Sequence, residues 1–335
     1  MKNNKQLPAY SIAIRTLGLA GEAFQRELRS IAMQTVKPER VVVYVADDYC
    51  GEELRDGSVC GEEYVYVRRG MVAQRALRYD EIETEYVMLL DDDVELATDS
   101  AEKMLRAMEE KEADCVGADT YKPHEMSWWQ KLYMFVANLD YPYCDNRWAF
   151  KIHRNGSFSY LCRVPQCEDF VLPTQYVAGP CAMWRKDAIR GLRWEDELWM
   201  DREAFSYMDD TVESYKLHVN GGRMFLHYGT GVTHLNAKTA SGMYRLTSKW
   251  FYIRAKMSFC VWWRTIYEVE KSRSSASFTA MAYTAKALWA ILVSFFAVFF
   301  FLNPTIPFFH VKGLVAGWRF VHSDDYRSIG KYMLN

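Results

Sequence analysis

Three consecutive aspartates, Asp91, Asp92 and Asp93, are the residues of this 335-residue chain that most suggest chemistry. They follow directly on the apolar run YVMLL at residues 86–90. Neighbouring carboxylates repel one another, so their concentration at the end of a buried strand favours a shared cation or ligand. Asp91 and Asp93 are separated by one residue, and in an extended or turning backbone both can point to one side. Carboxylate oxygens suit Mg²⁺ or Mn²⁺, although a solvated acidic turn would explain the triplet without chemistry.

Two further acidic pairs lie in comparable places. Asp47 and Asp48 follow another apolar run, and Asp209 and Asp210 stand at the start of a predicted helix. A carboxylate held there could take the proton of a reacting hydroxyl. The structural alternative for Asp209 and Asp210 is the favourable interaction of acids with a helix N-terminus.

The first hundred residues alternate predicted strands and helices. Short apolar runs predict strands at 11–14, 41–45, 64–67 and 86–90, and the spacing of apolar residues predicts helices at 23–33 and 72–79. This alternation indicates an α/β fold with a mainly parallel sheet. Ligands of such sheets bind beyond the carboxyl ends of the strands, which is where two of the acidic groups fall.

The rest of the chain is less regular. Residues 150–161 predict a hairpin with a type I′ turn at Asn155-Gly156, residues 175–184 a strand and a loop, and residues 204–219 a helix. Residues 244–267 interleave basic and aromatic side chains, which suits either anionic headgroups or ordinary packing of an amphipathic helix.

Residues 287–302 contain no charge and would form a helix about 24 Å long. Extending the helix to about 280–302 includes only Lys286, which can reach the membrane interface from there. We expect this helix to insert into a membrane, either spanning it or re-entering at Asn303-Pro304. The flanking charges do not fix its orientation.

Composition limits the classes of partner. Half of the residues are hydrophobic, a quarter are charged and the net charge is −2, which argues against a nucleic-acid binder. The N-terminus lacks the apolar segment of a secretory signal, so we expect the globular part in the cytosol. The eight cysteines form no CxxC pair and are interpreted as packing residues or free thiols.

Five segments between residues 10 and 235 resemble, in their order, the family 2 glycosyltransferases of the GT-A fold. The segments are SIAIRTLG, RELRSIAMQTVKPERVVVYVADD, RRGMVAQRAL, EYVMLLDDDVEL and YMDDTVESYKLHVNGG. The resemblance implies an inverting transfer of sugar from a nucleotide-sugar donor to an acceptor hydroxyl, with Mg²⁺ or Mn²⁺ as cofactor. It implies donor contacts from Thr16, Asp47, Asp48, Arg75, Asp91 and Asp92, a D-x-D metal site of Asp91, Asp93 and His234, and Asp210 as general base beside Asp209. Asp209 stands where the family usually has a glutamate.

The tail segments WFYIR and KGLVAG are similar to those of bacterial enzymes that build cell-surface polysaccharides. This implies a glycan or lipid-linked sugar as acceptor and a location at the inner (cytoplasmic) membrane, with the catalytic domain on the cytoplasmic side. We therefore expect a GT-A catalytic domain at residues 1–240 and a membrane-associated region at 241–335.

Two alternatives stay open. A sugar nucleotidyltransferase would share the fold and the acids, but it usually has a basic, glycine-rich loop after the first strand. Here that loop reads RTLGLAGEAF, with Arg15 as its single cation. A non-catalytic, membrane-bound nucleotide-sugar-binding protein would have no need of the acids, and all three acidic positions are present.

Overall fold

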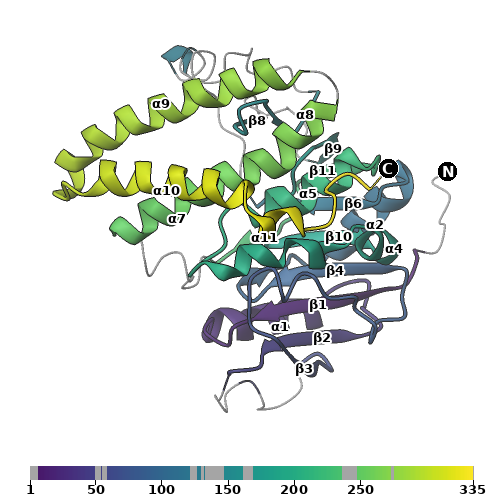
Figure 1. Ribbon diagram of the computed structural model, residues 1–335. Coiled ribbons are helices and arrows are strands. Elements are labelled where there is room, and N and C mark those ends of the chain that lie inside the picture. Colours follow the sequence, from purple (N-terminus) through teal and green to yellow (C-terminus); the bar gives the residue numbers. More distant parts are fainter. Residues whose placement is uncertain are drawn as a thin grey trace. The chain divides into compact units, whose positions relative to one another are not determined.

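The computed structural model describes residues 7–49, 54, 59–120, 127–129, 132, 147–160, 169–235, 247–272 and 275–334. The chain forms two compact units, each built from segments that are distant in the sequence (Figure 1). The first comprises Met1–Lys122, Pro165–Glu195 and Gly221–Lys238, and the second Pro123–Val164, Asp196–Asn220 and Thr239–Asn335. The boundaries of these units differ from those of the domains expected at 1–240 and 241–335. The division into a catalytic domain and a membrane-associated region stays a prediction.

The first unit contains an eight-stranded sheet in the order β3-β2-β1-β4-β10-β6-β11-β9. Its strands are β1 (Tyr10–Thr16), β2 (Val41–Ala46), β3 (Glu63–Val67), β4 (Tyr86–Asp91), β6 (Cys115–Ala118), β9 (Phe170–Pro173), β10 (Cys181–Arg185) and β11 (Met224–Tyr228). Strands β3, β2, β1 and β4 are parallel, as are β6 and β11. Strand β10 is antiparallel to its neighbours β4 and β6, and β9 is antiparallel to β11. The predicted α/β class with a mainly parallel sheet is confirmed.

The sheet is covered by helices that the apolar spacing explains. Every residue of β1 and β2 is buried, as expected of strands covered on both faces. Helix α1 (Glu22–Ala32) places Phe24, Leu28 and Ile31 in the core, and α2 (Ser100–Lys111) and the short α4 (Lys186–Gly191) belong to the same unit. Because β1, β2 and β4 are parallel, their carboxyl ends lie at one edge of the sheet.

The helix predicted at 72–79 is wrong, because these residues form a series of turns. The side chain of Gln74 is buried there, and its amide donates to the carbonyls of Thr16 at 2.9 Å and Tyr44 at 3.1 Å. Tyr79 has a φ of 51°, which a regular helix does not allow. Tertiary hydrogen bonds to the sheet therefore replace the regular helical ladder.

The second unit is mainly helical. Its helices are α5 (Asp209–Val219), α7 (Ser248–Trp262), α8 (Glu268–Ser272), α9 (Ala276–Phe301), α10 (Ile306–Val321) and α11 (Asp324–Arg327), with a 3₁₀ segment at Trp194–Arg202 and a π-helical turn at Trp263–Tyr267. The 3₁₀ segment begins in the first unit and continues into the second. The predicted helix at 280–302 is present as α9, four residues longer at its start.

The predicted hairpin is present as β7 (Phe150–Ile152) and β8 (Phe158–Tyr160). The predicted type I′ turn is wrong, because Gly156 has a positive φ of 71° while Asn155 does not. The amide of Gly156 donates to the carbonyl of His153, and the amide of His153 donates to the carbonyl of Ser157. This pattern, with glycine alone in the left-handed region, is that of the longer hairpin loop with a bulge.

Helix α5 is fixed inside the second unit by a buried ion cluster. Glu197 accepts from Lys216 of α5 at 3.0 Å and from Arg264 of the π-helical turn at 2.8 Å. All three side chains are at most 2% exposed. The indole of Trp199 donates to the second oxygen of Glu197. This cluster was not predicted, because its members lie 19 and 48 residues apart in the sequence.

Candidate active site

Asp91 lies at the carboxyl end of β4, beside Arg15 of β1 in the parallel register. The guanidinium of Arg15 donates to Asp91 Oδ1 at 2.8 Å and to the carbonyl of Gly179 at 2.9 Å. Arg75, also buried, approaches the same oxygen of Asp91 at 3.8 Å. Two arginines thus meet the first aspartate of the triplet, where a phosphate could also be bound.

Asp92 points to β1. Its Oδ2 accepts from the Thr16 hydroxyl at 2.5 Å, and that hydroxyl accepts in turn from the amide of Gly18 at 2.8 Å. Burial, with the nearby charges of Asp91 and Asp93, raises the pKa of Asp92 to about 7, although the Thr16 bond partly opposes the shift. Asp92 is therefore held away from the other two acids by the strand beside it.

Asp93 meets His234, which lies 141 positions away in the sequence. Strand β5 (Val94–Glu95) pairs antiparallel with β12 (Thr233–His234), and this brings His234 Nε2 to 3.1 Å from Asp93 Oδ1. The Leu235 amide also donates to the Asp93 carbonyl. Asp93 is buried and His234 is partly exposed.

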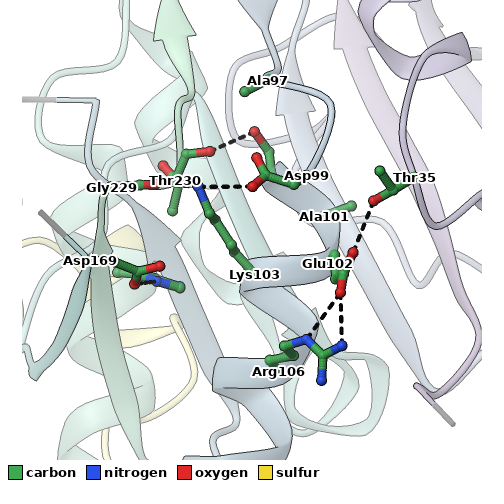
Figure 2. A network of polar contacts seen from close by, with 12 residues as sticks. Thr35, Ala97, Asp99, Ala101, Glu102, Lys103, Arg106, Asp169, Gly229 and Thr230 are labelled. Atoms are coloured by element: carbon green, nitrogen blue, oxygen red, sulfur yellow. Dashed lines mark hydrogen bonds and ion pairs between the residues drawn. The ribbon is translucent and has the colours of Figure 1, made fainter. Parts of the chain in front are cut away.

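The loop before β12 is fixed by a polar network with α2 (Figure 2). Ser100 donates to the carbonyl of Thr230 at 2.7 Å, and Lys103 donates to the carbonyl of Gly229 at 2.9 Å. Asp119, after β6, accepts from the amides of Gly229 and Thr230. At Gly231 a Cβ would come within 2.6 Å of Ala97. The sequence GTGVTH is thus suited to hold His234 opposite Asp93.

Asp47 and Asp48 follow β2 and are both exposed. Asp48 forms an ion pair with Arg69 at 2.5 Å, and Asp47 accepts from the amide of Arg69 at 3.1 Å. The ring of Tyr49 lies where a Cβ on Gly18 would stand, at 2.2 Å. The ends of β1 and β2 therefore approach closely, and only glycine fits at residue 18.

Glu27 of α1 is a residue that the sequence analysis missed. It is fully buried, and within the described residues neither of its carboxyl oxygens has a hydrogen-bond partner. Burial and the charges of Asp92, Asp91 and Asp93 raise its pKa well above its usual value, while the amide of Val94 opposes this. The signal was present, because Phe24, Glu27, Leu28 and Ile31 share one helical face. Arg15 and Gln74 were also missed, because Arg15 depends on the register of β1 with β4 and Gln74 on hydrogen bonds to the carbonyls of Thr16 and Tyr44.

Asp209 and Asp210 begin α5 in the second unit. Asp209 is buried and Asp210 is half-buried, and the preceding Met208 has a φ of 66°. The carbonyl of Asp210 accepts from the Ser214 hydroxyl at 2.6 Å. The predicted position of this pair at a helix N-terminus is confirmed.

The residues near Asp93 fit a divalent cation. Among the described residues, no three histidine, cysteine or acidic side chains form a closed metal cage. Mg²⁺ and its analogues are usually held by one or two carboxylates together with substrate phosphates and water. Asp93 and His234 provide such a partial set, and the buried carboxyl of Glu27, which has no hydrogen-bond partner among the described residues, interacts with the charges of the aspartate triplet. Asp91 is already paired with Arg15, so Asp93 is the better placed carboxylate for a cation.

A family model described as glycosyl transferase family 2 matches residues 66–169, less than half of the chain. The match contains Arg75 and the three aspartates and ends at Asp169. No curated protein sequence matches the chain.

Three solved structures share 12% sequence identity with the chain. The crystal structure of GalNAc-T7 with UDP, GalNAc and Mn²⁺ has a TM-score of 0.49 and covers 76% of this chain. This chain spans 48% of that one, about half its length. Residues 1–349 of S. aureus TarS give a TM-score of 0.49, with 87% of this chain and 74% of that chain covered. The mannosyltransferase PcManGT from Pyrobaculum calidifontis, in complex with GDP-Man and Mn²⁺, gives 0.48, with 94% and 88% covered.

The family match agrees with the resemblance found in the sequence, and the mainly parallel sheet agrees with the predicted α/β class. The predicted class of enzyme, a glycosyltransferase, and the predicted GT-A-like fold are confirmed.

Proposed function

We propose that this glycosyltransferase is inverting and metal-dependent, and that it moves a sugar from a nucleotide-sugar donor to an acceptor hydroxyl. The observation that carries the proposal is the pairing of Asp93 with His234, at the strand end where Arg15 and Arg75 meet Asp91. A divalent cation, Mg²⁺ or Mn²⁺, held by Asp93 and His234 with Asp91 beside them, would supply positive charge against the departing diphosphate.

The remaining residues at this edge suit donor binding. Arg75 is buried and offers several N–H groups to a phosphate. Thr16 donates a hydrogen bond to Asp92 and orients it, and we assign both residues to donor binding. Asp47 and Asp48 are exposed at the end of β2 and can accept hydrogen bonds from the nucleotide.

Asp210 is our candidate for the general base, with Asp209 beside it. In the proposed step the acceptor oxygen attacks the anomeric carbon on the face opposite the diphosphate, and its proton passes to the carboxylate of Asp210. The bond between that carbon and the diphosphate oxygen breaks, and its electron pair leaves with the nucleoside diphosphate. Attack from the opposite face inverts the configuration of the sugar.

The acceptor we propose is a glycan or a lipid-linked sugar of cell-surface polysaccharide or glycolipid synthesis. Helix α9 supports this, because it is the one helix of the described residues that is long and apolar enough to cross a membrane. A lipid-linked acceptor would explain why a catalytic domain at residues 1–240 needs a membrane-associated region at 241–335. The proposed location is the inner membrane, with the catalytic domain on the cytoplasmic side.

The test is nucleotide release from a panel of UDP- and GDP-sugars with Mn²⁺, together with the anomeric configuration of the product. D93N and D210N should each lose activity, while D187N, an exposed acid on α4, should keep it. Retained turnover in both D93N and D210N would overturn the site, and a retained configuration would overturn inversion. Pyrophosphate from a sugar 1-phosphate and UTP would identify a nucleotidyltransferase instead. Donor binding without turnover on any acceptor would identify a binding protein.

A further inference from the structure

The second half of α9 exposes large apolar side chains. Among the most exposed are Leu288, Leu292, Phe295, Phe296, Phe299 and Leu302, the last at 87%. Only 17% of the most apolar window of this helix is buried inside the protein. An apolar surface of this kind marks an interaction site rather than a core.

The positive charge of helices α7, α9 and α10 indicates an anionic partner for this surface. Helices α7, α9 and α10 contain six lysines and arginines and no aspartate or glutamate, although the whole chain has a net charge of −2. Lys256 is paired with Glu203 at 2.5 Å, and Lys286 donates to the carbonyl of Asn155 at 2.9 Å. Lys312 and Arg319 are exposed on α10, with no acidic partner among the residues that the structure describes. Exposed cations beside exposed aromatic residues complement a bilayer with anionic headgroups.

Both ends of the α9–α10 pair are attached to the same unit. At the start of α9, the Arg154 guanidinium lies 5.1 Å from the ring centroid of Phe278, and Lys286 bonds to the β7–β8 turn. At the other end, α10 packs on the backbone of α7. A Cβ at Gly313 would come within 2.3 Å of the Tyr252 carbonyl oxygen, and one at Gly317 within 3.0 Å of the Lys256 carbonyl oxygen. Figure 1 shows α10 running back from the end of α9 and lying between α9 and α7 in this view.

This connectivity favours a hairpin over a single crossing of the membrane. Helix α9 is long enough to cross a membrane, but its first turns are attached to the protein through Phe278 and Lys286. The part that is free to insert, residues 287–302, would reach about 24 Å before the chain turns at Asn303, less than a hydrocarbon core of about 30 Å. If Lys312 lies at the level of the phosphates, Asn303 lies at most about 13 Å deeper, within one leaflet of about 15 Å. A tilt of the hairpin reduces this depth, brings Arg319 closer to the phosphates and lets more of α9 enter the leaflet. Trp289 and Trp318 are exposed and are suited to the interface region.

We propose that α9 and α10 form a re-entrant hairpin that docks this unit on one leaflet of an anionic bilayer. Residues 288–302 enter the hydrocarbon, and Lys312 and Arg319 bind the phosphates of anionic lipids. The hairpin deepens the membrane association proposed above, by fixing which lipids are bound and that the helix does not cross. Membrane binding does not require turnover. If the protein bound vesicles but showed no transferase activity, only the proposed catalysis would be overturned.

Flotation of the full chain with phosphatidylcholine vesicles, with and without 30% phosphatidylglycerol, tests the lipid preference. The anionic vesicles should bind more protein, and added salt should weaken that binding. K312Q/R319Q should lower the partition coefficient about fivefold for each charge removed, roughly 25-fold in total. The matched control R327Q/K331Q removes two exposed charges outside the three helices and should leave binding nearly unchanged. Equal binding to both vesicles, or equal loss in both double variants, would overturn the headgroup assignment.

The depth of the turn between α9 and α10 in the bilayer tests whether the two helices form a re-entrant hairpin. A bimane probe on L302C, with the unmodified chain labelled as background, should be quenched by lipids brominated near the middle of one acyl chain. A membrane-impermeant thiol reagent should not label the L302C variant at this position from either side of the vesicle membrane. Labelling from the far side would show a crossing helix, and labelling from the near side would show a helix that stays in water; either result contradicts the hairpin. F295S/F296S/F299S, with folding checked by circular dichroism, should lose binding to both vesicle types.

Discussion

The two units bury charge in opposite ways. In the first unit, Glu27 and the aspartate triplet concentrate acids near one strand end, and Arg15 with Arg75 neutralises only Asp91. In the second unit, a single Glu197 accepts from two buried cations. Although burial alone would raise the pKa of Glu197, Arg264 and Lys216 hold it below its usual value. The pKa of Glu27 is instead raised by burial and by the neighbouring acids.

This difference distinguishes the cluster around Glu197, which stabilises the fold, from the cluster around the aspartate triplet, which needs a bound ligand. A buried acid between two cations is satisfied within the protein, and removing one partner leaves an uncompensated charge. Buried acids that repel one another are costly to fold, and a bound cation relieves that cost. We therefore expect variants of the first cluster to change metal binding and variants of the second to change stability.

D93N should have the largest effect. Removing one carboxylate from the partial set at His234 should weaken Mn²⁺ binding and lower turnover about a thousandfold. Mn²⁺ affinity can be measured by electron paramagnetic resonance in the presence of UDP or GDP, and stability by urea unfolding in EDTA. The unfolding free energy should not fall, since an acid that repels its neighbours is removed.

E197A should lower stability and leave metal binding unchanged. It leaves Lys216 and Arg264 buried without their carboxylate, which should lower the unfolding free energy by about 3 kcal/mol. Mn²⁺ affinity measured on the folded fraction should stay unchanged. Replacing all three residues by methionine should recover most of the stability, because no charge is then left unpaired. If E197A weakened metal binding as much as D93N does, the contrast between the clusters would not hold.

The sequence predicted the sheet more accurately than the site. Strands β2 and β4 contain continuous apolar runs, so burial on both faces could be inferred from their composition. The helix predicted at 72–79 failed because Gln74 bonds to two strands, a tertiary effect that apolar spacing does not record.

The site depended on contacts between distant segments. Arg15 meets Asp91 only because β1 and β4 pair in a particular register. His234 was reached through the resemblance to a family, and its position opposite Asp93 follows from the pairing of β5 with β12. Glu27 could have been found from helical spacing, since an acid on an apolar helical face is unusual enough to require a reason.

E27Q should have a smaller effect that depends on pH. Because the pKa of Glu27 is raised on folding, the folded state binds the proton more tightly, and stability from this group is present below pH 4.5 and is lost as pH rises. E27Q removes this loss, so it should stabilise the protein by about 1–2 kcal/mol at pH 8 and by less at pH 5. Thermal unfolding at both pH values in EDTA measures the difference, and E22Q, on the exposed side of α1, should show none. A larger gain at pH 5 than at pH 8 would contradict the buried, unpaired carboxyl.

T16V should have the smallest effect, because Thr16 acts through Asp92 rather than on the cation. Without the hydroxyl, Asp92 loses the bond that directs it to β1, and Mn²⁺ affinity in the presence of nucleotide should fall about tenfold. Isothermal titration of Mn²⁺ measures this. The matched control is T35V, because the hydroxyl of Thr35 bonds to the partly exposed Glu102. T16S keeps the hydroxyl and should restore the affinity, which a purely steric role of Thr16 would not predict. A fall as large as that in D93N would instead mean that Asp92 is itself a metal ligand, and the cation would then have to be assigned to Asp92 and Asp93 together.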